Sequence, residues 1–227
     1  MKKEFATNCG GIQPNEGITE LVFILDKSGS MAGMEKDTIG GFNAMIEKQK
    51  KLDGKVYVST ILFSNFSKVL HDRKNLEEIE PLTENDYQTD GCTALLDAVG
   101  GAIKHISNIH KYARKEDVPD RTMFVITTDG MENASKKYQY DKVKEMIAEM
   151  EGKHGWEFLF LASNIDVEET AHNIGLAEDH FVCYSVRDET TAMYEEVGAT
   201  ISGFRKNKKV NYGSMEGNIK KRSKKTK

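Results

Sequence analysis

Three short segments of the chain carry oxygen-bearing side chains that could bind a hard metal ion. One segment follows the apolar run at residues 21–25, a second lies within residues 90–95, and a third follows the apolar run at residues 123–127. Carboxylate and hydroxyl oxygens are hard ligands, and a site with few carboxylates suits Mg²⁺, which keeps several of its waters. The candidate ligands are Asp26, Ser28, Ser30, Thr93 and Asp129.

The elements that would position these ligands alternate between apolar, β-rich runs and longer segments of helical period. That alternation is typical of a parallel sheet covered by helices on both faces. Strands are predicted at residues 21–25, 56–63, 67–71, 123–127, 158–161 and 181–184, and helices at 34–52, 94–112, 140–152, 167–174 and 190–204. The predicted fold class is α/β, a single doubly wound, Rossmann-like domain with a mainly parallel central sheet. Residues 67–71 should return as a short antiparallel edge strand.

This fold predicts that the three segments meet. In an open sheet of this kind, ligands bind beyond the carboxyl ends of the strands. Two strands would deliver Asp26 and Asp129 to that edge. Thr93 lies at the start of a predicted helix, where free N–H groups and a hydroxyl can orient a hydrated cation and an approaching anion. Residues 132–135 are predicted to form a turn and a helix cap.

The combined motif resembles the metal-ion-dependent adhesion site of von Willebrand factor A (vWA) domains. The D-x-S-x-S motif of that family matches Asp26, Ser28 and Ser30, its threonine matches Thr93 in a G-x-T-x-L context, and its second aspartate before glycine matches Asp129. The resemblance covers about residues 18–204. In length the chain is similar to short, free-standing bacterial and phage members, including those of the tellurium-resistance-associated type.

The resemblance implies a role for each ligand. Ser28, Ser30 and Thr93 would be neutral inner ligands of Mg²⁺, with Mn²⁺ or Ca²⁺ as alternative ions, while Asp26 and Asp129 would act largely through water. A cation held mainly by neutral oxygens keeps much of its positive charge, so an Asp or Glu carboxylate of a partner protein would complete its coordination. We therefore expect a metal-dependent protein-binding module and no enzyme, with no catalytic residue.

Two alternatives stay open at this point. A strand-terminal aspartate with a second aspartate and Mg²⁺ also describes phosphatase-like hydrolases, in which the first aspartate is the nucleophile. Ser28 stands where such enzymes usually place a second acid, and the chain has neither a Walker A pattern nor G-x-G-x-x-G. Asp and Ser after a strand are also common turn and cap residues, which is the plainest structural explanation of each residue taken alone.

Composition sets the frame for these hypotheses. The chain has 227 residues, 38% hydrophobic and 30% charged, which fits one soluble globular domain with tails. Its first residues lack the apolar core of a secretory signal, and no run approaches the roughly 20 apolar residues of a membrane span. The three cysteines, Cys9, Cys92 and Cys183, are far apart and form no C-x-x-C pair. We expect a cytoplasmic protein with reduced thiols.

Charge is distributed unevenly along the chain. Residues 205–227 hold ten basic residues and one acid, so this segment carries about +9 and the preceding residues about −13. We predict three parts: an N-terminal loop segment at 1–17, the vWA domain at 18–204, and a basic, disordered tail at 205–227. The tail could bind nucleic acid or another polyanion through its charge, with strong salt dependence.

Overall fold

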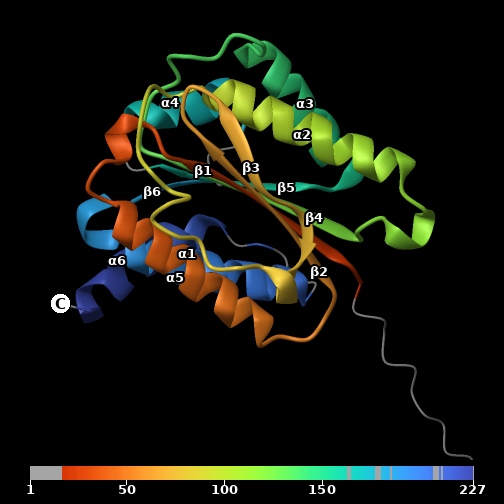
Figure 1. Cartoon of the computed structure of the whole chain (residues 1–227), viewed down its shortest axis with the longest axis horizontal. Coiled ribbons are helices and arrows are strands. Elements are labelled where there is room, and N and C mark those ends of the chain that lie inside the picture. The colour runs from red at the N-terminus through yellow and green to blue at the C-terminus, as the bar shows by residue number, and fades with distance from the viewer. Residues whose placement is uncertain are drawn as a thin grey trace, which may run out of the picture.

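A six-stranded sheet forms the centre of the molecule and carries helices on both faces (Figure 1). The computed structural model describes residues 17–162, 165–176, 180–184, 186–206, 210 and 212–226. The strands are β1 (Thr19–Asp26), β2 (Val56–Phe63), β3 (Ser67–Asn75), β4 (Arg121–Thr128), β5 (Glu157–Ala162) and β6 (Phe181–Cys183). Their order is β3-β2-β1-β4-β5-β6, and β3 runs antiparallel to β2 while the other pairs are parallel. The predicted fold class is confirmed.

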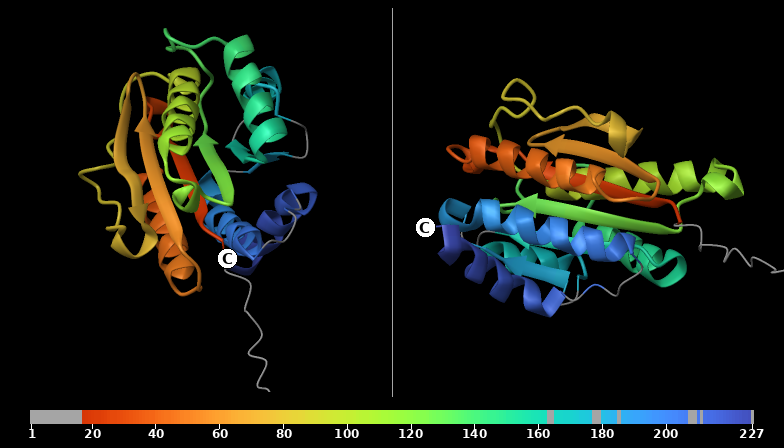
Figure 2. Two further views of the ribbon diagram at one scale, coloured as in Figure 1. Left: turned by 90° about the vertical axis from the view of Figure 1, so that its right-hand side faces the viewer. Right: turned by 90° about the horizontal axis from the view of Figure 1, so that it is seen from below.

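The helices form two layers, one on each face of the sheet (Figure 2). The helices are α1 (Glu35–Lys50), α2 (Leu95–Tyr112), α3 (Tyr140–His154), α4 (Ile165–Asn173), α5 (Val186–Arg205) and α6 (Met215–Thr226). Helices α1, α5 and α6 contribute to one apolar core, and α2, α3 and α4 contribute to the other. The sheet is therefore enclosed on both sides, which explains why its central strands are almost continuously apolar.

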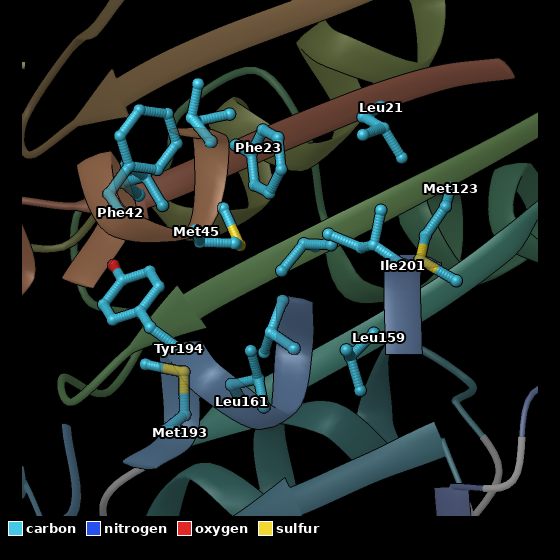
Figure 3. Close-up of a cluster of buried hydrophobic side chains, with 14 of the residues drawn as sticks. Leu21, Phe23, Phe42, Met45, Met123, Leu159, Leu161, Met193, Tyr194 and Ile201 are labelled. Atoms are coloured by element: carbon cyan, nitrogen blue, oxygen red, sulfur yellow. The ribbon is translucent and has the colours of Figure 1, made fainter. Parts of the chain in front are cut away.

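Alternation along β1 divides its side chains between the two cores. Leu21 and Phe23 point toward α1 and α5, whereas Val22 and Ile24 point toward α2 and α3. Figure 3 shows the first of these cores, in which Phe23 lies edge-on to Phe42 of α1 with ring centroids 5.3 Å apart. The buried strand thus has a fixed register, which sets the direction of each side chain along it, including Asp26 at its end.

Several predicted boundaries differ from the structure. The edge strand continues to Asn75, four residues beyond the predicted end, because Tyr57 and Val58 of β2 pair with its second half across a bulge. Helix α5 begins at Val186, four residues before the predicted start. Residues 1–16 of the predicted N-terminal loop lie outside the described residues. No helix in the described ranges is long and apolar enough to cross a lipid bilayer.

The predicted disordered tail is wrong for much of its length. Arg205 is buried, and its guanidinium donates hydrogen bonds to main-chain oxygens at the C-terminal end of α1, including Gln49 O at 2.7 Å. Helix α6 then packs on α5 through Met215 and Ile219, which are buried in the same core. Their spacing puts two apolar side chains on one helical face, and burial of that face stabilises a segment that is otherwise basic.

Candidate metal centre

The carboxyl ends of β1 and β4 bring the first and third predicted segments together. Asp26 is the last residue of β1, and Ser28 and Ser30 follow it at a short 3-10 turn, Gly29–Met31. The two strands are parallel neighbours with Leu25 beside Thr127, so the loop after β4 begins next to the loop after β1. Asp129 therefore reaches the segment of the two serines, and Ser30 Oγ donates a hydrogen bond of 2.6 Å to its Oδ1.

Three hydroxyl groups converge above Gly130, the residue after Asp129. A Cβ atom built on Gly130 would lie 2.6 Å from Thr93 Oγ1, 3.1 Å from Ser30 Oγ and 3.5 Å from Ser28 Oγ. The three hydroxyls come from two different loops, and the third loop supplies the glycine that leaves room for them. The structure thus brings all five predicted ligands to one place, around a space that any other residue at position 130 would fill.

Asp26 lies beneath this space and is fully buried. Its Oδ1 accepts a hydrogen bond from the Ser28 N–H at 2.7 Å, and its Oδ2 accepts one from Thr128 Oγ1 at 2.5 Å. Both donors are neutral. Burial raises the pKa of the Asp26 carboxyl to about 6, because desolvation outweighs the hydrogen bonds from Thr128 and Ser28 that favour the charged form. Burial also raises the pKa of the Asp129 carboxyl. The site therefore holds carboxylates whose charge is not compensated.

Residues outside the predicted set hold the ligands in place. The Thr93 N–H donates to Asn133 Oδ1 at 2.9 Å, and the Asn133 N–H donates back to Thr93 O at 3.0 Å. The Tyr87 hydroxyl donates to the main-chain oxygen of Asp26. Neither Asn133 nor Tyr87 belongs to the motif, and the sequence gives no signal for either contact because the partners are about 40 and 61 residues apart.

Of the turn and helix cap predicted at residues 132–135, the cap is confirmed, and it lies at the start of α2. Glu132 accepts the N–H of Leu96 at 2.8 Å and the hydroxyl of Ser135 at 2.7 Å, and the Ser135 hydroxyl accepts the N–H of Asp97 at 2.9 Å. The loop after β4 thus caps the N-terminal turn of α2, where main-chain N–H groups lack helical partners. Through this cap, the loop that carries Asp129 is joined to the helix that follows Thr93.

The donor set fits a small divalent cation. Ser28 Oγ and Ser30 Oγ are 3.0 Å apart, and adjacent ligands of an octahedral Mg²⁺ at 2.0–2.1 Å from the ion are separated by about 2.9 Å. Two carboxylates and three hydroxyls are all hard ligands. No cluster of three or more His, Cys, Asp or Glu side chains suited to a metal exists in the described ranges, so a cation here would depend on hydroxyl oxygens.

Solved structures with similar folds include vWA domains. The chain superimposes on the von Willebrand factor domain of the type V pilus tip protein Mfa5 from Porphyromonas gingivalis with a TM-score of 0.56 and 12% identity, over 82% of this chain and 95% of that one. It superimposes on a von Willebrand factor type A protein from Catenulispora acidiphila with a TM-score of 0.54 and 13% identity, over 82% of this chain and 43% of that one.

A third similar structure is proximal thread matrix protein 1 from the mussel byssus, with a TM-score of 0.53 and 14% identity over 80% of this chain and 45% of that one. The chain spans less than half the length of this protein and of the Catenulispora protein. No protein-family model and no curated protein matches the sequence. At these identities the comparisons establish the fold: the chain has the α/β fold of vWA domains.

Proposed function

We propose that this protein is a metal-dependent protein-binding module. Ser28, Ser30 and Thr93 would hold Mg²⁺ directly, while Asp26 and Asp129 would orient its waters. The bound ion would supply a positive charge that attracts a carboxylate. An Asp or Glu side chain of a partner protein would then occupy the remaining position of the coordination sphere.

The observation that carries this proposal is the buried Asp26 carboxylate. It is fully buried, and its two hydrogen bonds come from an N–H and a hydroxyl, with no ion pair to any side chain in the described part of the chain. Burial of an uncompensated carboxylate costs several kcal/mol in folding free energy. A cation bound by the adjacent hydroxyls would offset that cost. Cation binding would therefore explain why a carboxylate is buried at this position without an ion pair.

The hydrolase alternative receives less support. A nucleophilic aspartate must reach the substrate, whereas both Oδ atoms of Asp26 accept hydrogen bonds inside the fold. Asp129 is only half-buried, but Ser30 already donates to its Oδ1. A screen of phosphate-ester substrates in the presence of Mg²⁺ tests this alternative directly, and turnover that disappears in Asp129→Asn would favour the hydrolase.

The polyanion alternative is also weakened by the contacts of α6. Arg222 Nε lies 2.8 Å from a carboxylate oxygen of Glu196, and Lys220 pairs with Glu216. Part of the positive charge is thus used within the fold, and the helix is fixed to α5 rather than free to wrap a polymer. Heparin retention that falls steeply with salt would restore this alternative.

Calorimetric titration with Mg²⁺ tests the proposed function. We expect the native protein to bind one ion, and Ser28→Ala to weaken binding by about a hundredfold because a direct ligand is lost. Ser107→Ala is the matched control, since this α2 serine bonds only to the main-chain oxygen of Lys104 among the described contacts. Equal affinity in the native protein and Ser28→Ala would refute the site.

A further inference from the structure

A second surface feature lies beside the candidate metal centre. It is a groove of about 610 Å³ between the edge strand β3, helix α2 and the loop at residues 130–138, hereafter the β3–α2 groove. Strands β2 and β3 supply one wall and α2 the other. Apolar lining residues include Ile61, Phe66, Val69, Ala98, Ala102 and Tyr138. A volume of this size is typical of ligand-binding clefts.

Two large apolar side chains that line the groove are exposed. Phe66, in the turn between β2 and β3, is 81% exposed, and Val69 of the edge strand β3 is 51% exposed. On the opposite wall, a Cβ atom built on Gly101 of α2 would meet nothing within 4 Å. An exposed phenyl ring beside the open space at Gly101 leaves apolar surface in contact with water, and such patches mark sites of interaction.

The charges around the groove favour a negative occupant. Lys104, Lys136 and Lys137 line it, and none of their ammonium groups forms an ion pair within the described residues. The two acids of the groove are already engaged. Asp72 lies 2.8 Å from His105 Nε2, and Asp97 accepts three main-chain N–H groups from residues 136–138 at 2.8–3.0 Å.

Two residues of the groove lie next to residues of the candidate metal centre. Asn65 lines the groove and accepts the N–H of Cys92 at 2.6 Å, one residue before Thr93. Ala134 also lines the groove, one residue after Asn133, which pairs with both main-chain groups of Thr93. A chain that leaves the groove at this end therefore arrives at the residues that hold a candidate ligand.

We propose that the β3–α2 groove binds an acidic, apolar peptide segment of the protein whose carboxylate reaches the metal ion. Leucine or phenylalanine side chains of that segment would pack against Phe66, Val69 and the open floor at Gly101. Its Asp or Glu side chains would pair with the three lysines. The idea that one partner protein occupies both the groove and the metal ion rests on the proposed function. Binding of the peptide in the groove does not require a metal.

The first experiment measures the groove without metal. A fluorescein-labelled peptide of alternating Asp or Glu and Leu or Phe residues is titrated in EDTA by fluorescence polarisation, beside a peptide with Lys in place of each acid. We expect the acidic peptide alone to bind, with amide shifts in ¹H–¹⁵N spectra at Val69, Ala102 and Tyr138. Equal affinity of the two peptides, or shifts confined to α6, would overturn the proposal.

Two variants distinguish the groove from other surfaces. Gly101→Leu places a side chain in the open space of the groove, and leucine favours the helix more than glycine does. We expect this variant to bind the acidic peptide at least tenfold more weakly. Gly152→Leu is the matched control in α3, where a Cβ atom also meets nothing within 4 Å, and should leave affinity unchanged. Lys136→Glu with Lys137→Glu should also weaken binding at least tenfold. If Gly101→Leu instead abolishes self-association seen by sedimentation and leaves peptide affinity unchanged, the occupant is a second copy and the proposal fails.

A separate experiment tests whether one partner occupies both the groove and the metal ion. The acidic peptide is extended at either end by a Gly-Ser spacer and a terminal Asp, and its affinity is compared with that of the unextended peptide in Mg²⁺ and in EDTA. We expect a gain only in Mg²⁺, and no gain in Asp26→Asn. Equal affinities of the extended and unextended peptides in Mg²⁺ would show that one partner does not bind both sites. The calorimetric titration of Mg²⁺ alone then decides the metal site independently.

Discussion

Strand β1 carries a buried carboxylate near each end, and the two are compensated in different ways. Glu20 and Asp26 are both fully buried and, six residues apart, face the same side of the sheet. Glu20 lies 2.9 Å from Arg73 Nε and 2.6 Å from His110 Nε2. Among the described residues, Asp26 has only the neutral donors Ser28 and Thr128. The described part of the fold places an arginine beside Glu20 and no cationic side chain within ion-pair distance of Asp26.

The cation at Glu20 is placed at a conformational cost. Arg73 has φ of +45°, the one non-glycine residue with positive φ in the described part of the chain. Left-handed backbone is unfavourable for an arginine and persists only where surrounding contacts impose it. Its N–H is held by Ser59 Oγ at 3.1 Å, at the bulge between β2 and β3. The strained backbone of Arg73 thus places its guanidinium beside Glu20. In the described part of the chain, no residue with strained backbone places a cation beside Asp26.

The largest expected effect comes from removing the cation beside Glu20. Arg73→Met should lower the free energy of unfolding by about 3 kcal/mol, because it leaves a buried carboxylate with one fewer partner. Urea denaturation measures this change. Combining it with Glu20→Gln should recover part of the loss, since the neutral amide no longer needs a counter-ion. A loss below about 0.5 kcal/mol in Arg73→Met would mean that the pair contributes nothing measurable.

Removal of the buried carboxylate at the other end of β1 should act in the opposite direction. Asp26→Asn should leave the metal-free protein as stable as the native one or more stable, because it removes the desolvation of a carboxylate. Its Mg²⁺ affinity should fall about 10- to 100-fold, as is typical when a group that orients a metal shell is lost. Denaturation and calorimetry measure the two effects. Destabilisation without metal by more than about 2 kcal/mol would contradict the comparison.

The pH dependence follows from the raised pKa of Asp26. Burial brings this pKa from 3.8 to about 6, so between these values the folded state holds a proton that the unfolded state has released. Metal-free stability should therefore fall as pH rises through this window and level off above about 6. Mg²⁺ favours the ionised carboxyl, so its stabilisation should grow over the same window, with affinity improving by at most about tenfold per pH unit. Thermal melts with and without Mg²⁺ test this, and a Mg²⁺ effect that is constant from about pH 4.5 to 7.5 would contradict it.

The smallest effect is expected at Lys27, the residue after Asp26. Its Nζ lies 2.7 Å from Asp90 Oδ1 and 3.1 Å from Gln88 O, so it pairs with the loop before Thr93. Lys27→Met should cost about 0.5 kcal/mol of stability, since Asp90 is largely exposed, and should change Mg²⁺ affinity less than about twofold. A large gain in Mg²⁺ affinity would mean that Lys27 competes with the metal and that Asp26 has an internal cation after all.

The sequence predicted the parts of the site that depend on local order. Asp26, Ser28 and Ser30 lie within five residues after a buried strand, and apolar runs of this length place such loops reliably at a sheet edge. Contacts between distant segments left no such signal. The pairing of Thr93 with Asn133, and the hydroxyl that Tyr87 directs to Asp26, depend on loop conformations that no periodic pattern encodes.

The error at the C-terminus has a different origin. Ten basic residues dominated the composition of residues 205–227 and favoured disorder. The apolar residues Tyr212, Met215 and Ile219 are nevertheless spaced by three and four positions, which is a helical period, and all three are buried. Periodicity outweighed composition here because a packed face of a few large side chains is enough to fix a helix on an existing core.

The buried end of α5 limits how this domain could transmit force. Arg205 donates hydrogen bonds to the main-chain oxygens of Gln49, Leu52 and Asp53, and Arg121 binds the last carbonyls of α5 at 2.7 Å. Axial sliding of α5 would break these charge-assisted bonds together, each worth about 1.5–3 kcal/mol. The C-terminal end of α5 is therefore anchored to the end of α1 and to the start of β4, so a shift of the helix along its axis requires these bonds to break first.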